Sequence, residues 1–317
     1  MTPHGPESGA AVPTVSFVVP TRNSARTIAA CLDSIRRQRS VSVEVIVVDN
    51  RSTDATRSLA AARADRVVDH GPERSAQRNE GARLARGPVL VFVDSDMVLE
   101  PGVAAEAAEL LAADPRIGAA VIPERSFGEG FWARCRVLEK EIYLGDACVE
   151  AARVFRREAF DAVGGFDETL TGPEDFELPD RVLRAGWGLG RTRSQVWHDE
   201  GRVDLGELFA KKRYYGRGLS HYLRGTSSRP RLRRGSLVTL SSTLARRPLV
   251  SAGLAALKTV DAAGLVTGVI EARIAERAGQ VAGPAPGGRD AGGPRRRART
   301  RRTAAARATT TAPPTDS

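Results

Sequence analysis

Short apolar runs alternate with segments of helical hydrophobic spacing over the first hundred residues of the chain. The runs at 15–19, 43–50 and 89–93 are rich in β-branched residues, which is typical of strands buried on both faces of a parallel sheet. Between the first two, the apolar positions of 28–35 recur at helical spacing, with Ser24 as the expected N-cap. Strands that alternate with helices predict a doubly wound, mostly parallel α/β sheet with helices on both faces.

The later segments continue this alternation. A strand is expected at 66–70 and a helix at 75–87, which leads into the strand at 89–93. The stretch 126–160 predicts a helix, then a strand at 151–155 and the start of another helix. The first two strand-to-helix turns lack the pattern G-x-G-x-x-G, which argues against a dinucleotide-binding fold.

The strand at 89–93 ends in the acidic sequence Asp94, Ser95 and Asp96. This is its carboxyl end, where open α/β sheets bind their ligands. Two carboxylates there are costly unless a cation or a hydrogen-bonding ligand compensates them. A divalent metal that also holds a diphosphate is the simplest compensation, since hard cations share carboxylate and phosphate oxygens. Because D-x-D is short and common, a solvated acidic turn stays open as the alternative.

Composition limits the size and the cellular compartment of the protein. With 317 residues, 41% of them hydrophobic, the chain can form one large domain with a small appendage. Its three cysteines, Cys31, Cys135 and Cys148, show no metal-binding spacing and predict reduced thiols in a reducing compartment. Residues 1–14 lack the basic and apolar regions of a signal peptide and predict a disordered N-terminus.

The net charge of +10 raises nucleic acid and anionic membranes as partners. Much of this charge is local, because residues 281–317 contain eight Arg and two Asp, a net +6. The same segment is rich in Gly, Pro, Ala and Thr and predicts a disordered basic tail. It has no aromatic residue for stacking on single strands, so no specific nucleic-acid partner is expected.

Several motifs occur together in a fixed order. They are VVPTRN at 18–23, VIVVDNRSTD at 45–54, SAQRNEGARLARG at 75–87, VFVDSD at 91–96 and GGFDETLTGPEDFELPDRVLRAGW at 164–187. In this order and spacing they resemble the family 2 glycosyltransferases, which have the GT-A fold. The resemblance extends from residue 15 to residue 222, which is two-thirds of the chain.

The resemblance implies where a nucleotide-diphospho-sugar would bind. The nucleotide would lie over the loop at 20–23 and against Asp49, with Asp94 near the ribose and Asp96 on a Mn²⁺ or Mg²⁺ ion. The nucleotide-binding residues that it implies are Pro20, Thr21, Arg22, Asn23, Asp49, Arg78, Asn79, Asp94 and Ser95. A loop that enters a helix N-terminus does present free backbone donors to a phosphate or a base. Without the family, Asp49 would be expected to cap the following helix, and Arg78 to be a solvated surface charge.

Glu174 and Asp175 follow Gly172 and Pro173 at the start of a predicted helix. Acids at this position also stabilise the helix dipole, which is the structural alternative. Sugar transfer with inversion, however, needs a carboxylate that accepts the proton of the acceptor hydroxyl. The resemblance assigns this catalytic role to Asp175 and leaves Glu174 to orient the acceptor or the base. Pro173 departs from the usual glycine, which puts the geometry of the loop in doubt.

His198, in the segment VWHDEGR, has the most informative context of the histidines. A lone histidine is more often a hydrogen-bonded structural residue than a ligand. His198, however, follows a short apolar run downstream of both acidic motifs, where the resembling enzymes complete their metal site with a histidine. We therefore expect Asp96 and His198 to be the metal ligands, a pair that suits Mn²⁺ as well as Mg²⁺.

A different composition begins in the last third of the chain. Residues 224–247 contain seven Arg and no acid, and residues 248–270 form an apolar run interrupted by Lys258 and Asp261. The run is long enough to span a bilayer, but two central charges make it a poor span. We expect a helical segment at 226–280 that lies on an anionic membrane surface, with a helix packed on the catalytic domain as the alternative.

Together these features predict a catalytic domain at 15–225 that moves a sugar from a nucleotide-diphospho-sugar to an acceptor hydroxyl, with inversion and metal dependence. The resemblance favours a UDP-sugar, with guanosine as the alternative base. The acceptor stays open, and a lipid-linked one would suit the expected location, which is cytoplasmic and peripheral at the inner face of the cell membrane. Two further classes stay open: a non-catalytic sugar-nucleotide binding module, and a nucleotidyltransferase that uses the same sheet and metal.

Overall fold

The computed structural model describes residues 14–145, 150–170, 172–225 and 244–277. The basic tail, residues 1–13, Cys148 and most of the arginine-rich segment lie outside the described residues, so the predictions for them are not tested. Cys31 and Cys135 are buried free thiols, as expected.

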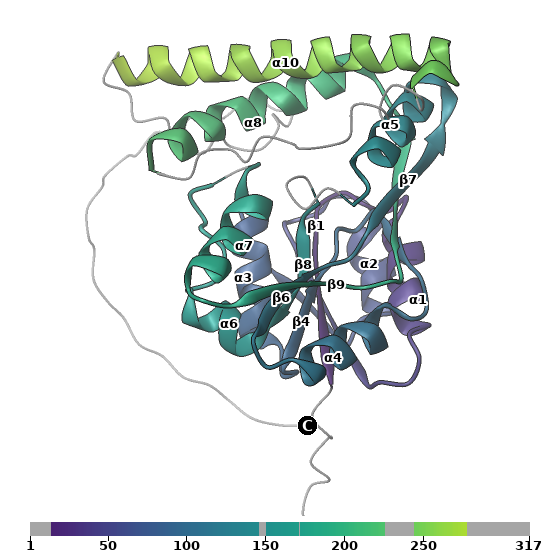
Figure 1. Ribbon diagram of the computed structural model, residues 1–317, viewed down its shortest axis with the longest axis vertical. Coiled ribbons are helices and arrows are strands. Elements are labelled where there is room, and N and C mark those ends of the chain that lie inside the picture. Colours follow the sequence, from purple (N-terminus) through teal and green to yellow (C-terminus); the bar gives the residue numbers. More distant parts are fainter. Residues whose placement is uncertain (1–13, 146–149, 171, 226–243, 278–317) are drawn as a thin grey trace, which may run out of the picture. The chain divides into compact units, whose positions relative to one another are not determined.

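A seven-stranded sheet forms the centre of the domain (Figure 1). Its strands are β1 (Val15–Thr21), β2 (Val43–Asp49), β3 (Arg66–Asp69), β4 (Val89–Phe92), β6 (Ile117–Val121), β8 (Ala152–Arg156) and β9 (Gly188–Arg191). They are ordered β3-β2-β1-β4-β8-β6-β9, and β8 runs antiparallel to both of its neighbours while the other pairs are parallel. The predicted mostly parallel α/β sheet is therefore confirmed.

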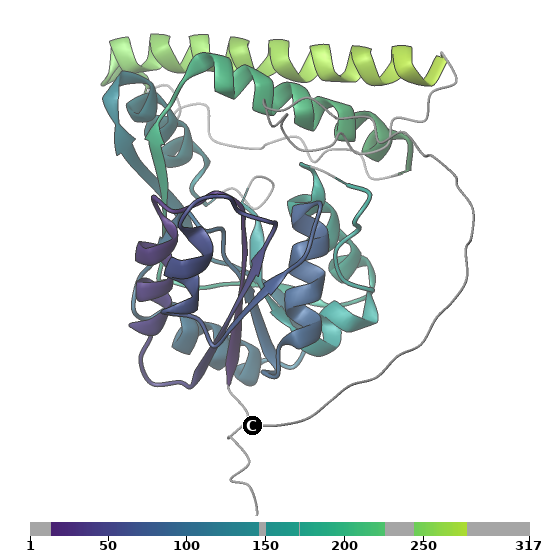
Figure 2. The same cartoon turned by 180° about the vertical axis from the view of Figure 1, so that it is seen from behind.

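Helices cover both faces of this sheet (Figures 1 and 2). One face packs on α1 (Ile28–Arg36), α2 (Thr56–Ala61) and α4 (Val103–Ala113), and the other on α3 (Arg74–Leu84), α6 (Arg157–Ala162) and α7 (Glu174–Arg184). Alternate residues of a strand point to opposite faces. In β1, Phe17 and Val19 therefore belong to the first core and Val18 to the second.

A second sheet, which the sequence did not predict, stands beside the first. It has three strands in the order β5-β10-β7, with the bounds β5 (Met97–Leu99), β7 (Glu124–Glu129) and β10 (Val196–Arg202). The helix predicted from residue 126 is wrong in its first turn, because β7 pairs with β10 and α5 (Gly130–Tyr143) begins only afterwards. Pairing between segments this far apart in the sequence overrides local preference.

The N-cap prediction for the first helix is also wrong. α1 begins at Ile28 with Thr27 as its N-cap. Ser24 lies one turn earlier, and its carbonyl oxygen accepts hydrogen bonds from the N–H groups of Thr27 (3.0 Å) and Ile28 (2.9 Å). The buried residues of this helix, Cys31 among them, lie at the predicted spacing.

Two long helices, α8 (Leu205–Gly225) and α10 (Pro248–Arg277), cross in close contact. A Cβ atom on Gly268 would lie 2.0 Å from the Arg213 carbonyl oxygen, and one on Gly216 would lie 2.3 Å from that of Leu265. Glycine is needed where backbones approach this closely. A small separate core joins α10 to α5, in which Leu257 packs with buried residues of both helices. α10 thus packs on the domain, as the alternative prediction has it.

Candidate active site

The carboxyl ends of β1, β2 and β4 meet at one edge of the sheet, as the sequence predicts. Thr21 and Asp49 are paired across the first two strands, and Asp94 lies just beyond the third. The side-chain amide of Gln77 donates hydrogen bonds to the carbonyl oxygens of Thr21 (3.0 Å) and Val48 (2.6 Å). This buried amide holds the ends of β1 and β2 against α3.

The loops that follow β1 and β2 are bonded to each other. Asn23, in the left-handed backbone region (φ 49°), accepts a hydrogen bond on Oδ1 from the Thr53 N–H (2.8 Å), and its own N–H donates to Ser52 Oγ (2.8 Å). Both carboxylate oxygens of buried Asp49 accept from Ser52, one from the N–H (2.9 Å) and one from the hydroxyl (2.5 Å). The loop expected to hold a nucleotide is therefore held by its own hydrogen bonds, while contacts with a nucleotide stay predictions.

Arg78 of α3 is the centre of an ion-pair network at this edge. Its side chain is only 1% exposed, so the alternative of a solvated surface charge is wrong. Nη1 donates to Asp175 Oδ1 (2.7 Å) and Nη2 to Asp94 Oδ1 (2.9 Å). The guanidinium also lies over the Phe166 ring, 5.1 Å from its centroid. One buried cation thus joins the two acidic motifs, which are far apart in the sequence.

Asp94 is compensated by arginines of the protein. Besides Arg78, Arg153 Nη1 lies 3.3 Å from Asp94 Oδ2 and Arg74 Nη1 lies 4.0 Å from Oδ1. Burial raises the pKa of Asp94, but the charges of Arg78, Arg153 and Arg74 outweigh burial and hold the pKa well below its usual range. Arg153 is not among the residues predicted from the sequence, although an arginine inside the apolar strand β8 is a signal for a buried partner.

Glu174 fixes the loop in front of α7. It is 2% exposed and accepts hydrogen bonds from Arg74 Nη2 (2.7 Å) and from the Gly172 N–H (2.5 Å). Pro173 occupies the N-cap position of the helix, where its missing N–H is tolerated. The loop therefore keeps a defined geometry in spite of the proline, and Glu174 contributes to that geometry from a buried position.

Asp175 lines a cavity instead. Burial raises the pKa of this carboxyl, but the charges of Arg78, Arg74 and Arg153 bring it below its ordinary value. Asp175 is consequently a carboxylate at neutral pH. Glu174 and Asp175 thus differ in environment: Glu174 is buried in the loop, and Asp175 faces the cavity.

The three-stranded sheet brings His198 to Asp96. β10 pairs with β5 in the register His198↔Met97, and the N–H of Asp199 donates to the Asp96 carbonyl oxygen (2.8 Å). As a result His198 Nε2 lies 3.1 Å from Asp96 Oδ2. The two expected metal ligands are therefore neighbours.

Further acids surround the imidazole. Nδ1 lies 3.3 Å from Glu124 Oε1 and 3.6 Å from Glu200 Oε1, although neither contact has hydrogen-bond geometry. Burial alone would lower the pKa of His198, but Asp96, Glu124 and Glu200 raise it to about 10. Without a metal the ring is therefore protonated at neutral pH, and a metal ion would have to displace that proton.

The surroundings of Asp96 fit a divalent cation. Asp96 Oδ1 is buried and has no hydrogen-bond partner among the described residues. Asp96 and His198 together offer an oxygen and a nitrogen, which Mn²⁺ and Mg²⁺ both accept. The described part of the chain contains no group of three or more His, Cys, Asp or Glu that could hold a metal. The pair thus fits an ion whose other ligands come from a substrate, as is common for ions bound to phosphates.

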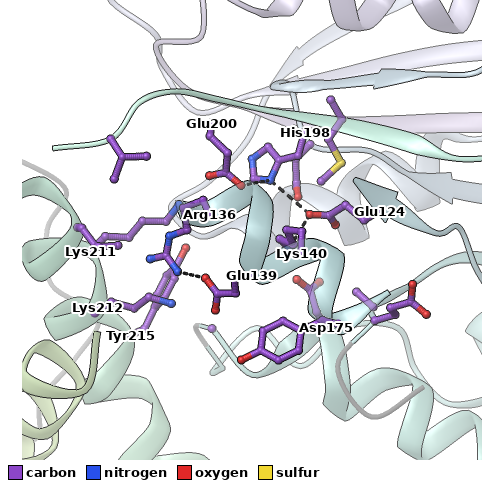
Figure 3. Close-up of a pocket in the computed structure, with 18 of the residues that line it drawn as sticks. Glu124, Arg136, Glu139, Lys140, Asp175, His198, Glu200, Lys211, Lys212 and Tyr215 are labelled. Carbon is purple, nitrogen blue, oxygen red and sulfur yellow. Dashed lines mark hydrogen bonds and ion pairs between the residues drawn. The ribbon is translucent and has the colours of Figure 1, made fainter. Parts of the chain in front are cut away.

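A cavity of about 760 Å³ connects these groups. Figure 3 shows His198 and Glu124 on one side of it and Lys211 and Lys212 of α8 on the other, with Asp175 also facing the space. The volume is typical of a small-molecule site. Its walls come from the sheet edge, the three-stranded sheet and the helices α5, α8 and α10.

The remaining predicted residues have partners of their own. The Asn79 side chain donates to the Phe166 carbonyl oxygen (2.9 Å) and accepts from the Phe166 N–H (2.9 Å), so it holds the loop before α7. Ser95 Oγ donates to Ser24 Oγ (2.8 Å), just after the loop at 20–23. Asp49 does not cap α2, which has a different N-cap. Nucleotide contacts of these three residues stay predictions.

Comparison with known proteins identifies relatives of the sheet region. A family model described as glycosyl transferase family 2 matches residues 16–164, which contain the loop at 20–23 and Asp96. The pre-mycofactocin glycosyltransferase of Mycobacterium tuberculosis is 33% identical over 233 residues, which are 67% of this chain and 48% of that relative. A PGL/p-HBAD biosynthesis glycosyltransferase of Mycobacterium bovis is 30% identical over 169 residues, 50% of this chain and 64% of the relative. The chain spans about half the length of the first of these proteins.

A solved structure shares the fold. The mannosyltransferase PcManGT from Pyrobaculum calidifontis, in complex with GDP-Man and Mn²⁺, has a TM-score of 0.52 at 23% identity, over 86% of this chain and 77% of its own. The family model places residues 16–164 in glycosyltransferase family 2, and the matched curated relatives are glycosyltransferases. The solved neighbour supports the GT-A fold.

Proposed function

We propose that the protein transfers a sugar from a nucleotide-diphospho-sugar to an acceptor hydroxyl, with inversion and with a divalent metal. The observation that carries the proposal is one cavity lined both by a carboxylate, Asp175, and by His198, which lies beside Asp96. Family membership supports the reaction class. The geometry supplies the two chemical functions the reaction needs, a proton acceptor and a site for the leaving group.

Asp175 is the proposed general base. The acceptor oxygen forms a bond to the anomeric carbon while the bond from that carbon to the diphosphate oxygen breaks, and the hydroxyl proton passes to Asp175. A single displacement of this kind inverts the anomeric configuration. The low pKa that Arg78 imposes keeps Asp175 ionised, so the carboxylate is ready at neutral pH. The same low pKa makes Asp175 a weak base. Proton transfer to it is therefore favoured late in the step, when the acceptor oxygen is most acidic.

Asp96 and His198 are the residues proposed to hold a Mn²⁺ or Mg²⁺ ion. When bound, such an ion stabilises the negative charge that develops on the departing diphosphate. The loop at 20–23 and Asp49 are proposed to bind the nucleotide. We propose uridine as the base; the solved mannosyltransferase binds GDP-Man, which makes guanosine the second base to examine.

Nucleotide binding can be tested by thermal unfolding of the full chain with UDP or GDP, with and without Mn²⁺. A ligand that binds only the folded state raises the apparent stability. We expect a shift of the unfolding temperature with UDP that requires the metal. A shift with GDP alone would replace uridine by guanosine, and the absence of any nucleotide effect would contradict the proposal.

The released product separates this reaction from its alternatives. Sugar transfer releases a nucleoside diphosphate, whereas a nucleotidyltransferase releases pyrophosphate. Incubation with the nucleotide-sugar that stabilises the protein, followed by chromatography of the nucleotide products, distinguishes the two. Binding without any turnover in the presence of acceptor extracts would favour a non-catalytic module.

We also propose that the outward face of α10 lies on an anionic membrane surface. The segment from Pro248 to Ala275 is apolar and long enough to cross a membrane by length and composition. Asp261, however, is 3% exposed and paired with Arg136 of α5, so one face of the helix belongs to the domain. The other face exposes Leu249, Val266, Ile270 and Ile274.

Charge supports a lipid surface as the partner of this face. Between residues 248 and 275 the acids of α10 are Asp261 and Glu271, and both are paired with arginines of neighbouring helices. The exposed positions of that range include Arg273 but no acid, and Lys258 is bonded to Glu139 on the side of the domain. Each Arg or Lys near an anionic surface contributes about 1 kcal/mol, and the apolar face adds its burial. A membrane-proximal location would suit a lipid-linked acceptor.

Vesicle co-sedimentation tests this surface. The double variant Val266→Glu, Ile270→Glu should bind vesicles of anionic lipid at least about tenfold more weakly than the parent. The reason is that each substitution removes more than about 1.4 kcal/mol of favourable free energy from burial of the apolar side chain in the lipid. The matched control is Ala30→Glu, Ala61→Glu, which makes the same charge change at exposed positions of α1 and α2. Equal binding by both double variants would contradict the proposed surface.

A further inference from the structure

The helical wall of the cavity is strongly basic. It carries Arg136 on α5, Lys211 and Lys212 on α8, and Lys258 on α10. Figure 3 shows Arg136, Lys211 and Lys212 on the side of the cavity away from His198. Three helices that are remote in the sequence thus direct cations into one space.

Two carboxylates of this wall are already used. Asp261 accepts hydrogen bonds from Arg136 Nη2 (2.8 Å) and Nη1 (3.0 Å). Glu139 accepts from Arg136 Nη1 (2.5 Å) and from Lys258 Nζ (2.7 Å). Arg136 and Lys258 are therefore neutralised by these two acids, which leaves the lysines of α8 to be accounted for.

Lys212 and Lys211 carry positive charges that the bonded acids of this wall do not balance. Lys212 Nζ lies 4.0 Å from Asp261 Oδ1, at the limit of an ion pair and with an acid that Arg136 already holds. Lys211 Nζ lies over the Tyr215 ring, 6.0 Å from its centroid, and among the described residues no acid forms an ion pair with it. Glu207 also lines the cavity but forms no ion pair with any described residue. The four cations therefore exceed the three acids of these helices, Glu139, Asp261 and Glu207, and among the described residues only the first two acids are bonded to them.

The positive charge of Lys212 is partly buried without a close acid of its own, and a bound anion would stabilise it. The Lys212 side chain is 27% exposed. Burial lowers its pKa, and the charges of Arg136 and Lys258 lower it further against the opposing effect of Asp261 and Glu139. A partly buried cation of this kind is stabilised by an anion placed beside it. The proposed donor site, beside Asp96 and His198, lies at the opposite wall of the cavity.

We infer that the wall formed by Arg136, Lys211, Lys212 and Lys258 binds a phosphate group of the acceptor. This inference rests on the proposed function and adds the chemical class of the acceptor, a hydroxyl compound that carries a phosphate. Because Asp175 lines the same cavity, an acceptor anchored through its phosphate on the helical wall can direct its hydroxyl towards the base. The donor diphosphate belongs to the other wall, beside Asp96 and His198.

The experiment measures binding of inorganic phosphate to the full chain by calorimetry, without metal or nucleotide. The variant Lys211→Gln, Lys212→Gln should bind phosphate at least about tenfold more weakly than the parent. The control variant Arg83→Gln, Arg116→Gln removes two exposed cations, whose ion pairs lie within α3 and before β6, and should bind phosphate like the parent. Equal affinities for both variants, or no phosphate binding by the parent, would overturn the inference.

Nucleotide affinity separates this site from the donor site. The lysine variant should bind nucleoside diphosphate with Mn²⁺ as tightly as the parent does. A parallel loss of nucleotide affinity would mean that the lysines hold the donor diphosphate, and it would overturn the inference while leaving the proposed reaction intact. Failure of the parent to bind any nucleotide would instead contradict the proposed function.

The source of the phosphate is resolved by two probes. Glycerol phosphate represents a soluble phosphate monoester, and vesicles that contain phosphatidic acid represent a lipid phosphate. Binding of either probe that is lost in the lysine variant and retained in the control supports the inference and identifies the source. Binding of neither probe would overturn it.

Discussion

The two walls of the cavity use the same kinds of side chain but differ in charge balance. At the sheet edge, four cations are bonded to four acids: Arg74, Arg78, Arg153 and Lys140 to Asp94, Glu124, Glu174 and Asp175. Two further acids, Asp96 and Glu200, lie beside His198 and bring the acids to six. On the helical wall, four cations share Glu139 and Asp261. The charge balance therefore favours binding of a cation at the sheet edge and of an anion at the helical wall.

Two walls of opposite charge balance would allow a single cavity to hold two charged substrates in a fixed orientation. A metal ion with its diphosphate suits the acidic wall, and a phosphate suits the basic wall. Asp175 lines the same cavity from the acidic wall, which is why we propose that it acts on a hydroxyl of the second substrate.

The largest effect is expected from Arg78→Met. This substitution leaves Asp94 and Asp175 without their shared buried cation, and removal of one partner of a buried ion pair costs about 3–5 kcal/mol. Denaturant unfolding measures the loss. Arg83→Met, on the same helix and 67% exposed, is the control and should cost less than about 1 kcal/mol. Similar losses in both variants would show that Arg78 is not the centre of the acidic wall.

Asp175→Asn should lower turnover by about 10² or more, because the amide keeps the shape but does not accept the proton. Nucleotide binding should persist, since the acidic wall keeps Asp96 and His198. Asp180→Asn on the same helix is the matched control and should leave turnover unchanged. Steady-state kinetics with the stabilising nucleotide-sugar decides the point, and normal turnover in Asp175→Asn would exclude Asp175 as the base.

Asp96→Asn should weaken metal-dependent nucleotide binding by about 10–100-fold, the loss typical of a disturbed metal site. The physical reason is the buried Asp96 oxygen without a partner, which the ion would otherwise occupy. Calorimetry with nucleoside diphosphate and Mn²⁺ measures the change, and Asp114→Asn, paired with Arg116 at the surface, serves as the control. Unchanged affinity in folded Asp96→Asn would remove Asp96 from the acidic wall's metal site.

The smallest effect is expected from Lys258→Gln on the basic wall. Lys258 is 45% exposed and its ion pair with Glu139 is partly screened by solvent, so its loss should cost about 0–1 kcal/mol of stability. Arg136 remains to hold Glu139 and Asp261 in this variant. Thermal unfolding measures the change, and a loss comparable to that of Arg78→Met would contradict the difference between the two walls.

Local sequence patterns were sufficient to predict most strands of the large sheet and the edge at which the candidate site lies. The apolar runs ending at Asp49 and Asp94 predict buried parallel strands because the chain cannot bury such residues otherwise, and the strands lie as expected. Acids after such strands predict a ligand site, and Asp96 and His198 do lie together. The strand β8 lies where it was expected, but its antiparallel direction and the whole second sheet escaped prediction, since each depends on pairing with a remote segment.

The α/β alternation and the acidic edge follow from the sequence alone, because both depend on residue types at short, regular spacing, while the resemblance to the family rests on the order of several motifs. The tertiary fold was needed to show that Arg78 is buried between two acids and that Lys258 and Asp261 turn towards α5 and not towards a bilayer. It also decided that the lysines of α8 face the same space as Asp175. Whether a charge is solvated, paired or in excess depends on which remote segments surround it, and neither periodicity nor spacing along the chain carries that information.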